Sequence, residues 1–347
     1  MKKVILVVDD NKANLIHAQR LLAASYKVAA VNSGKQAFSY LEKNIPNLIL
    51  LDIQMPEMDG FSVMETLQQD VRWKKIPVIF LTADRSEGTE ENCFKMGAMD
   101  YITKPFIPSI MQQRVRRILE LEDYQTNLEQ MVEAQTARIT QMQQDIIMTM
   151  ANLIESRDGT TGEHIRRTSI YSNLLARHLL EKGIYANVID EDFVECLSKV
   201  APLHDIGKIT IPDAILRKPG KLTAEEYEQI TSHAREGARL LEQNMASIAE
   251  PEFLQMACDV ACYHHEKWSG GGYPDGLKGE EIPLSARILA IADVFDALIS
   301  KRSYKKSMTV EDAFAIMEKE REERFEPILF DAFLELKPEL VQLIEEN

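Results

Sequence analysis

Short, nearly uninterrupted apolar runs recur through the first 120 residues, and segments with helical spacing separate them. The runs are KVILVVDD, YKVAAV, NLILLD, PVIFLT and MDYITKP, and the helical segments include NLIHAQRLLAAS, GKQAFSYLEKN and GFSVMETLQQD. Runs of this kind, alternating with helices, are typical of a parallel sheet that is covered on both faces. The pattern therefore predicts a doubly wound, flavodoxin-like α/β domain over residues 1–120.

Four of these five runs end in polar side chains suited to phosphoryl chemistry. The side chains are those of Asp9, Asp10, Asp52, Thr82 and Lys104. Ligands of open parallel sheets bind at the carboxyl ends of the strands, so we expect these groups to meet at one edge. The three carboxylates would repel one another unless a hard cation such as Mg²⁺ lay among them. Asp52 is the candidate carboxylate nucleophile, whereas the alternative, helix capping, explains each aspartate only singly.

Residues 121–153 contain no glycine or proline and carry a heptad pattern. Seven of the ten seam positions are apolar; the ten are Leu121, Gln125, Leu128, Val132, Gln135, Ile139, Met142, Ile146, Thr149 and Leu153. This spacing predicts a linker helix that pairs with a second copy as a parallel coiled coil and makes the protein a homodimer. Gln135 would weaken the middle of the seam. A single amphipathic helix lying against one domain is the alternative.

Residues 154–347 combine helical periodicity with a concentration of histidines. Six of the seven histidines follow residue 160. The candidate metal ligands are His164, His204, Asp205, His233, His264, His265 and Asp293. Successive side chains on a helix diverge by about 100°, so the adjacent histidines His264 and His265 can bind one metal only at a helix end. Histidines with bridging carboxylates suit Fe, Mn, Zn or Ni better than Mg or Ca, and paired ions suit attack on a phosphodiester. The alternative is a helical bundle with incidental histidines.

Net charge, apolar stretches and cysteine spacing indicate which partners and which cellular compartment to expect. A formal net charge of -15 over 347 residues argues against nucleic acid polymers or anionic membranes as main partners. No apolar stretch approaches the length of a membrane span. The four cysteines form no CxxC pair and are expected to be reduced. These features predict a cytoplasmic protein.

The first 120 residues closely resemble the receiver domain of bacterial two-component response regulators. The resemblance rests on the acidic pair, on LLDIQMPEMDG, on the threonine and on the KP at the last strand. It implies that Asp52 accepts a phosphoryl group from a cognate histidine kinase, beside an Mg²⁺ bound by Asp9, Asp10 and Asp52. It also implies that Thr82 and Tyr101 form a switch pair, with Lys104 on the phosphoryl oxygens.

The second half is similar to the HD-GYP family of cyclic di-GMP phosphodiesterases, through HDIGK, HHEKWSGGGYPDGLKG and RILAIADVFDAL. The resemblance implies two transition-metal ions, with Fe or Mn favoured and Ni or Zn left open. It assigns His164, His204, Asp205 and Asp293 to one ion and Asp205, His233, His264 and His265 to the other, with Asp205 as the catalytic bridge. Lys208 would lie near the scissile phosphate. The remaining substrate contacts would be Tyr273, in a flexible glycine-rich wall, and Arg302 and Lys305, on ligand phosphates.

Three positions depart from the family pattern. Thr160 replaces a glutamate that some members use for a third metal, Ser269 replaces a frequent acidic residue, and Glu326 replaces an aspartate. None of these is a core ligand. We therefore expect an α/β receiver joined by a long helix to an all-α domain that hydrolyses cyclic di-GMP to pGpG, with further conversion to GMP left open. The alternatives are a catalytically weak module that binds a nucleotide or a protein, and a phosphodiesterase for another cyclic dinucleotide.

Overall fold

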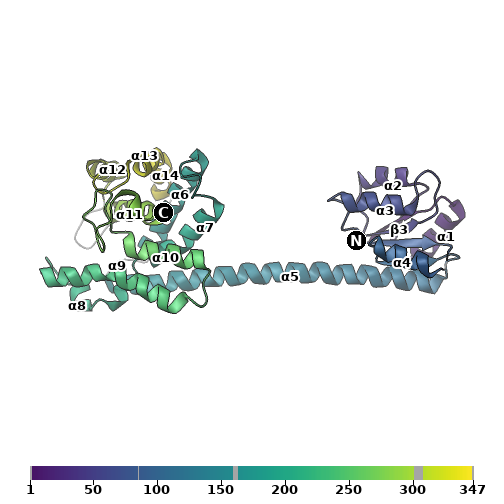
Figure 1. Ribbon diagram of the computed structural model, residues 1–347, viewed down its shortest axis with the longest axis horizontal. Coiled ribbons are helices and arrows are strands. Elements are labelled where there is room, and N and C mark those ends of the chain that lie inside the picture. The colour runs from purple at the N-terminus through teal and green to yellow at the C-terminus, as the bar shows by residue number, and fades with distance from the viewer. Residues whose placement is uncertain (1, 85, 159–162, 301–307, 346–347) are drawn as a thin grey trace. The chain divides into compact units, whose positions relative to one another are not determined.

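The computed structural model describes residues 2–84, 86–158, 163–300 and 308–345. The chain forms two compact units, Met1–Thr136 and Ala137–Asn347, which are described separately below (Figure 1). The division falls within one helix, α5 (Pro108–Glu155). The domain boundaries expected from the sequence, after residues 120 and 153, stay predictions.

The N-terminal unit contains the predicted parallel sheet. Its five strands follow the order β2-β1-β3-β4-β5, and all pairs are parallel. The strands are β1 (Val4–Val8), β2 (Lys27–Val31), β3 (Leu48–Asp52), β4 (Val78–Thr82) and β5 (Asp100–Thr103). Every residue of β3 and β4 is buried, which explains their continuous apolar sequences.

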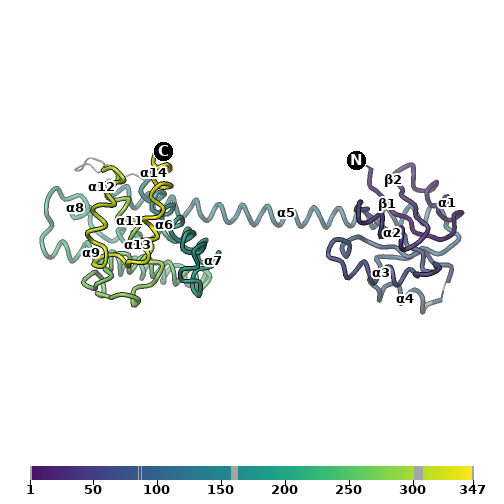
Figure 2. Tube along the Cα trace, turned by 90° about the horizontal axis from the view of Figure 1, so that it is seen from above, coloured from purple at the N-terminus to yellow at the C-terminus, as the bar shows by residue number. Residues whose placement is uncertain are grey.

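Helices cover both faces of this sheet (Figure 2). Alternate strand residues point to opposite faces, so that Ile49 and Leu51 pack in one apolar cluster and Leu48 and Leu50 in the other. One face is covered by α2 (Gly34–Leu41), α3 (Gly60–Gln69) and α4 (Glu87–Lys95), and the other by α1 (Lys12–Leu22) and the start of α5. The doubly wound fold expected from the sequence is confirmed.

The long helix α5 exposes the predicted heptad seam. Its seven apolar seam side chains are between 48% and 64% exposed; they are Leu121, Leu128, Val132, Ile139, Met142, Ile146 and Leu153. The last turn is different, because Ala151, Ile154 and Glu155 are buried. An exposed apolar strip is what pairing with a second copy requires, and the coiled-coil dimer stays a prediction.

The described residues of the C-terminal unit are helical, with connecting turns. The helices are α6 (Glu163–Lys182), α7 (Glu191–Val200), α8 (Asp213–Leu216), α9 (Ala224–Met245), α10 (Pro251–Tyr263), α11 (Leu284–Ile299), α12 (Val310–Lys319), α13 (Pro327–Glu335) and α14 (Lys337–Glu345). Helices α9 and α10 lie side by side (Figure 1). Tyr171, Phe295, Phe314 and Phe333 form an aromatic core between α6, α11, α12 and α13. None of the described helices has the length and apolar character that crossing a bilayer demands.

Candidate metal centre and phosphoacceptor site

The polar strand ends of the N-terminal unit meet at one edge of the sheet, as the sequence predicts. Oxygen atoms of Asp9, Asp10 and Asp52 lie within 4.8 Å of one another, a group that fits Mg²⁺. The Lys104 ammonium is 2.8 Å from the Asp9 carboxylate and 2.7 Å from that of Asp52. Burial raises the pKa of Asp52, and Lys104 acts in the opposite direction.

The predicted switch residues lie on the neighbouring strands β4 and β5. The Thr82 hydroxyl accepts a hydrogen bond from the Asp84 amide at 3.0 Å and donates one to the Asp84 carbonyl at 3.2 Å. The Tyr101 ring lies edge-on to Phe94, with 5.9 Å between ring centroids. A hydrogen bond with Glu90 raises the pKa of Tyr101. In this structure the Thr82 hydroxyl therefore bonds with the loop that follows β4.

In the C-terminal unit, a glycine allows the His204–Asp205 segment to approach α9. Helix α7 ends at Val200, and after His204 and Asp205 the chain enters the 3-10 helix η3 (Ile206–Thr210). A Cβ atom on Gly207 would lie only 1.9 Å from the carbonyl oxygen of His233 on α9. Only glycine permits this backbone contact, which places Asp205 beside the His233 ring.

The structure brings the seven predicted metal ligands together. Donor atoms of Asp205, His233, His264 and His265 lie within 4.8 Å of one another, and so do those of His164, His204 and Asp205. Asp205 therefore belongs to both groups. Asp293 lies beside the second group, with its Oδ1 3.5 Å from His164 Nε2. Helix α10 ends at Tyr263, so the adjacent histidines follow a helix end, as predicted.

Backbone carbonyls hold three of these imidazoles in one tautomer. The Nδ1 atoms of His204, His233 and His264 are 2.8, 2.6 and 2.9 Å from the carbonyls of Ala201, Ile230 and Val260, respectively. A carbonyl only accepts, so each Nδ1 carries a hydrogen, and in the neutral form of each ring the Nε2 lone pair faces the site.

Four buried polar atoms at this site call for a ligand. The Nε2 atoms of the same three histidines and Oδ1 of Asp205 have no hydrogen-bond partner among the described residues. Unpaired buried donors and acceptors are costly and rare, and a bound metal removes that cost here. The donor set, imidazoles around a carboxylate, fits a transition metal.

Electrostatics favours the coordinating form of His264, His265 and Asp205 but the protonated form of His204. Burial lowers the pKa of His264 and His265 well below the ordinary value, which favours the neutral ring. Burial alone would raise the pKa of Asp205, but Lys208 and His204 hold it well below the usual range. Burial also opposes a charge on His204, yet the neighbouring Asp205 raises its pKa to about 9, so a metal must displace a proton from this ring when it binds. Asp205 therefore stays ionised, as a bridging ligand must.

Comparison with known proteins shows which families the two parts of the chain match. Residues 128–329 match the family described as HD domain, and residues 5–116 match the response regulator receiver domain. The chain is 41% identical to a probable cyclic di-GMP phosphodiesterase of Vibrio cholerae, across 95% of this chain and 77% of the relative. It is 35% identical to the cyclic di-GMP phosphodiesterase response regulator RpfG of Xanthomonas campestris pv. campestris, across 98% and 89%.

The chain belongs to the HD-type cyclic di-GMP phosphodiesterase response regulators. It is also 32% identical to the 3'3'-cGAMP-specific phosphodiesterase 2 of Vibrio cholerae, across 81% of this chain and 52% of that relative.

Two carboxylates of this HD-type regulator were missed by sequence reasoning. Asp296 is fully buried, lies 2.7 Å from Nδ1 of His164 and accepts a hydrogen bond from Arg167 at 2.6 Å. Burial by itself raises the pKa of Asp296, but the bonds from His164 and Arg167 lower it below the ordinary value. The one available signal for Asp296 in the sequence was its position three residues after Asp293, on the same helix face.

Glu266 is the second carboxylate that sequence reasoning missed. It accepts hydrogen bonds from two amides of the following loop, those of Asp275 and Gly276.

The glycine-rich loop of this family member is anchored at several points. Its Tyr273 ring lies against the His265 ring, with 4.7 Å between centroids. The Trp268 amide donates to the Arg324 carbonyl at 3.2 Å. Gly270 and Gly271 have φ values of 90° and 81°, and a Cβ on Gly272 would lie 2.5 Å from the Glu266 backbone. The glycines of the expected flexible wall thus provide turns and a close approach.

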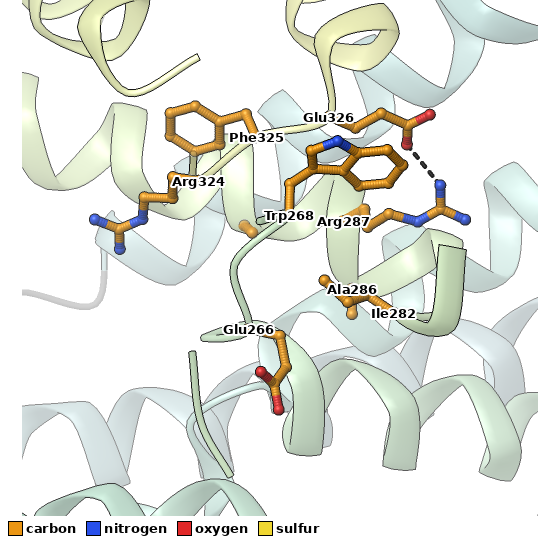
Figure 3. A pocket seen from close by; sticks show the side chains of 9 residues that line it. Glu266, Trp268, Ile282, Ala286, Arg287, Arg324, Phe325 and Glu326 are labelled. Carbon is orange, nitrogen blue, oxygen red and sulfur yellow. Dashed lines mark hydrogen bonds and ion pairs between the residues drawn. The ribbon is translucent and has the colours of Figure 1, made fainter. Parts of the chain in front are cut away.

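The positions that depart from the family pattern differ in environment. Thr160 lies outside the described residues, and so do Arg302 and Lys305, the predicted contacts to ligand phosphates. Glu163 opens α6 with its side chain 77% exposed and paired with Arg167, so it points away from His164. Glu326 is buried and pairs with Arg287 at 2.6 Å, next to the Trp268 ring (Figure 3).

Proposed function

We propose that this response regulator hydrolyses cyclic di-GMP to linear pGpG at a two-metal centre, with further conversion of pGpG to GMP left open. The convergence of unpartnered histidine nitrogens on Asp205, a carboxylate shared by both ligand groups, carries the proposal. Such a pair of sites suits in-line attack on a phosphodiester. The names of the relatives supply the substrate class.

The candidate site residues would have separate roles in this hydrolysis. His164, His204 and Asp293 would hold one ion and His233, His264 and His265 the other, and Asp205 would serve both. When bound, the ions would polarise the phosphodiester and lower the pKa of the attacking water. The Lys208 ammonium, which is 2.8 Å from Asp205, would contact the scissile phosphate. Tyr273 would form the wall beside the substrate, with Arg302 and Lys305 on ligand phosphates.

An assay across cyclic dinucleotides tests the substrate. Protein loaded anaerobically with Fe or Mn should open cyclic di-GMP, with products followed by chromatography. The 3'3'-cGAMP relative makes the hybrid dinucleotide the second candidate. Faster cleavage of 3'3'-cGAMP than of cyclic di-GMP would reassign the substrate, and cleavage of neither by metal-loaded protein would reject the function.

We predict two metal ions per catalytic unit. A third ion would need a carboxylate four residues before His164 in the sequence, where the chain has the neutral Thr160. The neighbouring Glu163 carboxylate is exposed. Anomalous scattering from crystals of the metal-loaded protein should give two peaks beside Asp205. A fully occupied third peak next to His164 would contradict this count.

Replacing Asp296 with asparagine should weaken metal binding about 10- to 100-fold, the usual cost of losing a partner of a metal-ligating histidine. The amide retains the shape but loses the charge that orients His164 and pairs with Arg167. Titration with Mn²⁺ followed by calorimetry measures the change. Asp331→Asn, which breaks an exposed pair with Arg321, is the matched control and should bind as the wild type does. Equal affinity in both variants would remove Asp296 from the site.

We further propose that a histidine kinase phosphorylates Asp52 and thereby controls the phosphodiesterase. The phosphoryl group should draw the Thr82 hydroxyl from Asp84 and reposition Tyr101, altering the receiver surface and the dimeric linker helix. Beryllofluoride treatment should change turnover or oligomeric state in the wild type but not in Asp52→Asn. Activity assays and light scattering follow both properties. Indistinguishable wild-type samples with and without beryllofluoride would exclude the coupling.

A further inference from the structure

The end of helix α5 is built into the catalytic unit. Upstream, the seam of this helix is exposed, whereas Ile154 is 7% and Glu155 only 2% exposed. A short 3-10 turn, η1 (Ser156–Asp158), continues from it. A carboxylate this deeply buried needs a partner, because desolvation disfavours its charge.

Glu155 makes an ion pair with the lysine of the HDIGK motif. Its Oε2 is 3.3 Å from the Lys208 ammonium, which is 2.8 Å from Oδ2 of Asp205. The Lys208 side chain is 14% exposed. One ammonium group thus links the last residue of α5 to the carboxylate shared by both ligand groups. The position of Glu155 therefore constrains where that ammonium can lie.

Arg157 holds the backbone on which Lys208 is carried. Its guanidinium donates to the carbonyls of Lys208, Ile209 and Ile211 at 3.3, 3.0 and 2.9 Å, and to the Asp213 carboxylate at 2.7 Å. These carbonyls lie at the end of η3. The planar fork of a guanidinium can serve several acceptors at once, which a single ammonium group cannot do. The backbone of Arg157 is itself held, because the Arg217 side chain donates a hydrogen bond to its carbonyl at 2.6 Å.

The helix η3 is therefore held from two sides. Gly207 contacts the backbone of α9, and Arg157 binds the carbonyls at its end. We propose that Glu155 and Arg157, the helix-end clamp, are positioning residues that set the place of the Lys208 ammonium beside Asp205. This inference deepens the proposed function and rests on it. Neither clamp residue is among the predicted metal ligands, so the clamp should affect turnover without affecting metal content.

Arg157→Lys tests the clamp, with Arg138→Lys as the matched control on the exposed part of α5. Arg157→Lys keeps the positive charge but loses the guanidinium N–H groups that donate to several acceptors at once. We expect kcat on cyclic di-GMP to fall about 10- to 100-fold, because small displacements of catalytic groups have effects of this size. KM, the number of bound ions and the melting temperature should stay within error of the wild type. Hydrogen exchange at amides 206–211 should accelerate only in Arg157→Lys.

Glu155→Gln provides a second test that changes one charge and almost no volume. Its kcat should fall about tenfold with unchanged metal content, the loss of roughly one charge-assisted contact. Glu133→Gln, exposed on the same helix, is the control. Wild-type kcat in both clamp variants would overturn the proposal, and so would a fall in activity that only mirrors a loss of metal.

The clamp and the proposed function can fail separately. If the metal-loaded wild type leaves cyclic dinucleotides intact, the phosphodiesterase proposal is wrong, and hydrogen exchange alone decides the clamp. Faster exchange at amides 206–211 in Arg157→Lys, with Arg138→Lys unchanged, supports it. Equal exchange in both variants refutes it.

Discussion

Replacing His204 and Asp205 together with alanine should abolish hydrolysis of cyclic di-GMP and strip the metal from the catalytic unit. Asp205 belongs to both ligand groups, so its loss removes a ligand from each ion, and His204 contributes a third missing donor. We expect turnover to fall by roughly 10⁴-fold or more, as when a member of a cooperating catalytic group is removed. Elemental analysis of the purified protein and a chromatographic assay measure the two effects.

The receiver unit provides an internal control for this double substitution. It has its own apolar clusters, so beryllofluoride should still bind at Asp52 in the variant. His178→Ala, which removes a histidine that pairs with Glu335, should keep both metal and activity. Turnover that survives in the double variant would rule out the two-metal mechanism.

Gly207→Ala should damage the same site without touching a ligand. The added Cβ would lie 1.9 Å from the His233 carbonyl oxygen and 2.6 Å from the Gly237 nitrogen, so η3 and α9 must separate. Asp205 and His233 would then no longer face one ion. We expect the catalytic unit to lose about 1–3 kcal/mol of stability and metal affinity to fall at least about tenfold.

Thermal unfolding and metal titration of Gly207→Ala measure these two effects. Gly88→Ala is the matched control, because a Cβ on Gly88 meets nothing within 4 Å and its helix favours alanine. This variant should be as stable as the wild type or slightly more so. Wild-type metal affinity in Gly207→Ala would show that the close approach of η3 to α9 does not set the ligand geometry.

Much of the fold could be predicted because local patterns already carry it. Buried parallel strands require continuous apolar runs, and such runs occur at β3 and β4. The carboxyl ends of parallel strands share one edge, so the meeting of Asp9, Asp10 and Asp52 followed without coordinates. The adjacent histidines required a helix end, and α10 ends one residue before His264.

Groups that act through distant partners could not be predicted in this way. Asp296 meets His164 across 132 residues, and Arg157 meets the η3 carbonyls across about 50. An aspartate near the end of an apolar helix, or an arginine after a linker, gives no local sign of such a partner. In the sequence alone, Gly207 likewise resembles an ordinary turn residue. The structure shows that a Cβ atom at this position would lie 1.9 Å from a backbone oxygen of α9.

The sequence by itself thus determined the two kinds of unit, the types of candidate ligand, the strand ends that carry the aspartates and the helix end before His264, because the period of the apolar residues and the geometry of a helix are local properties. Only the tertiary structure decided that Asp205 serves both ligand groups, that three histidines present Nε2, and that Glu155 and Arg157 reach the HDIGK segment. These outcomes depend on which backbone carbonyls and carboxylates the packed helices bring within hydrogen-bond distance, and packing between distant segments has no counterpart in the local pattern.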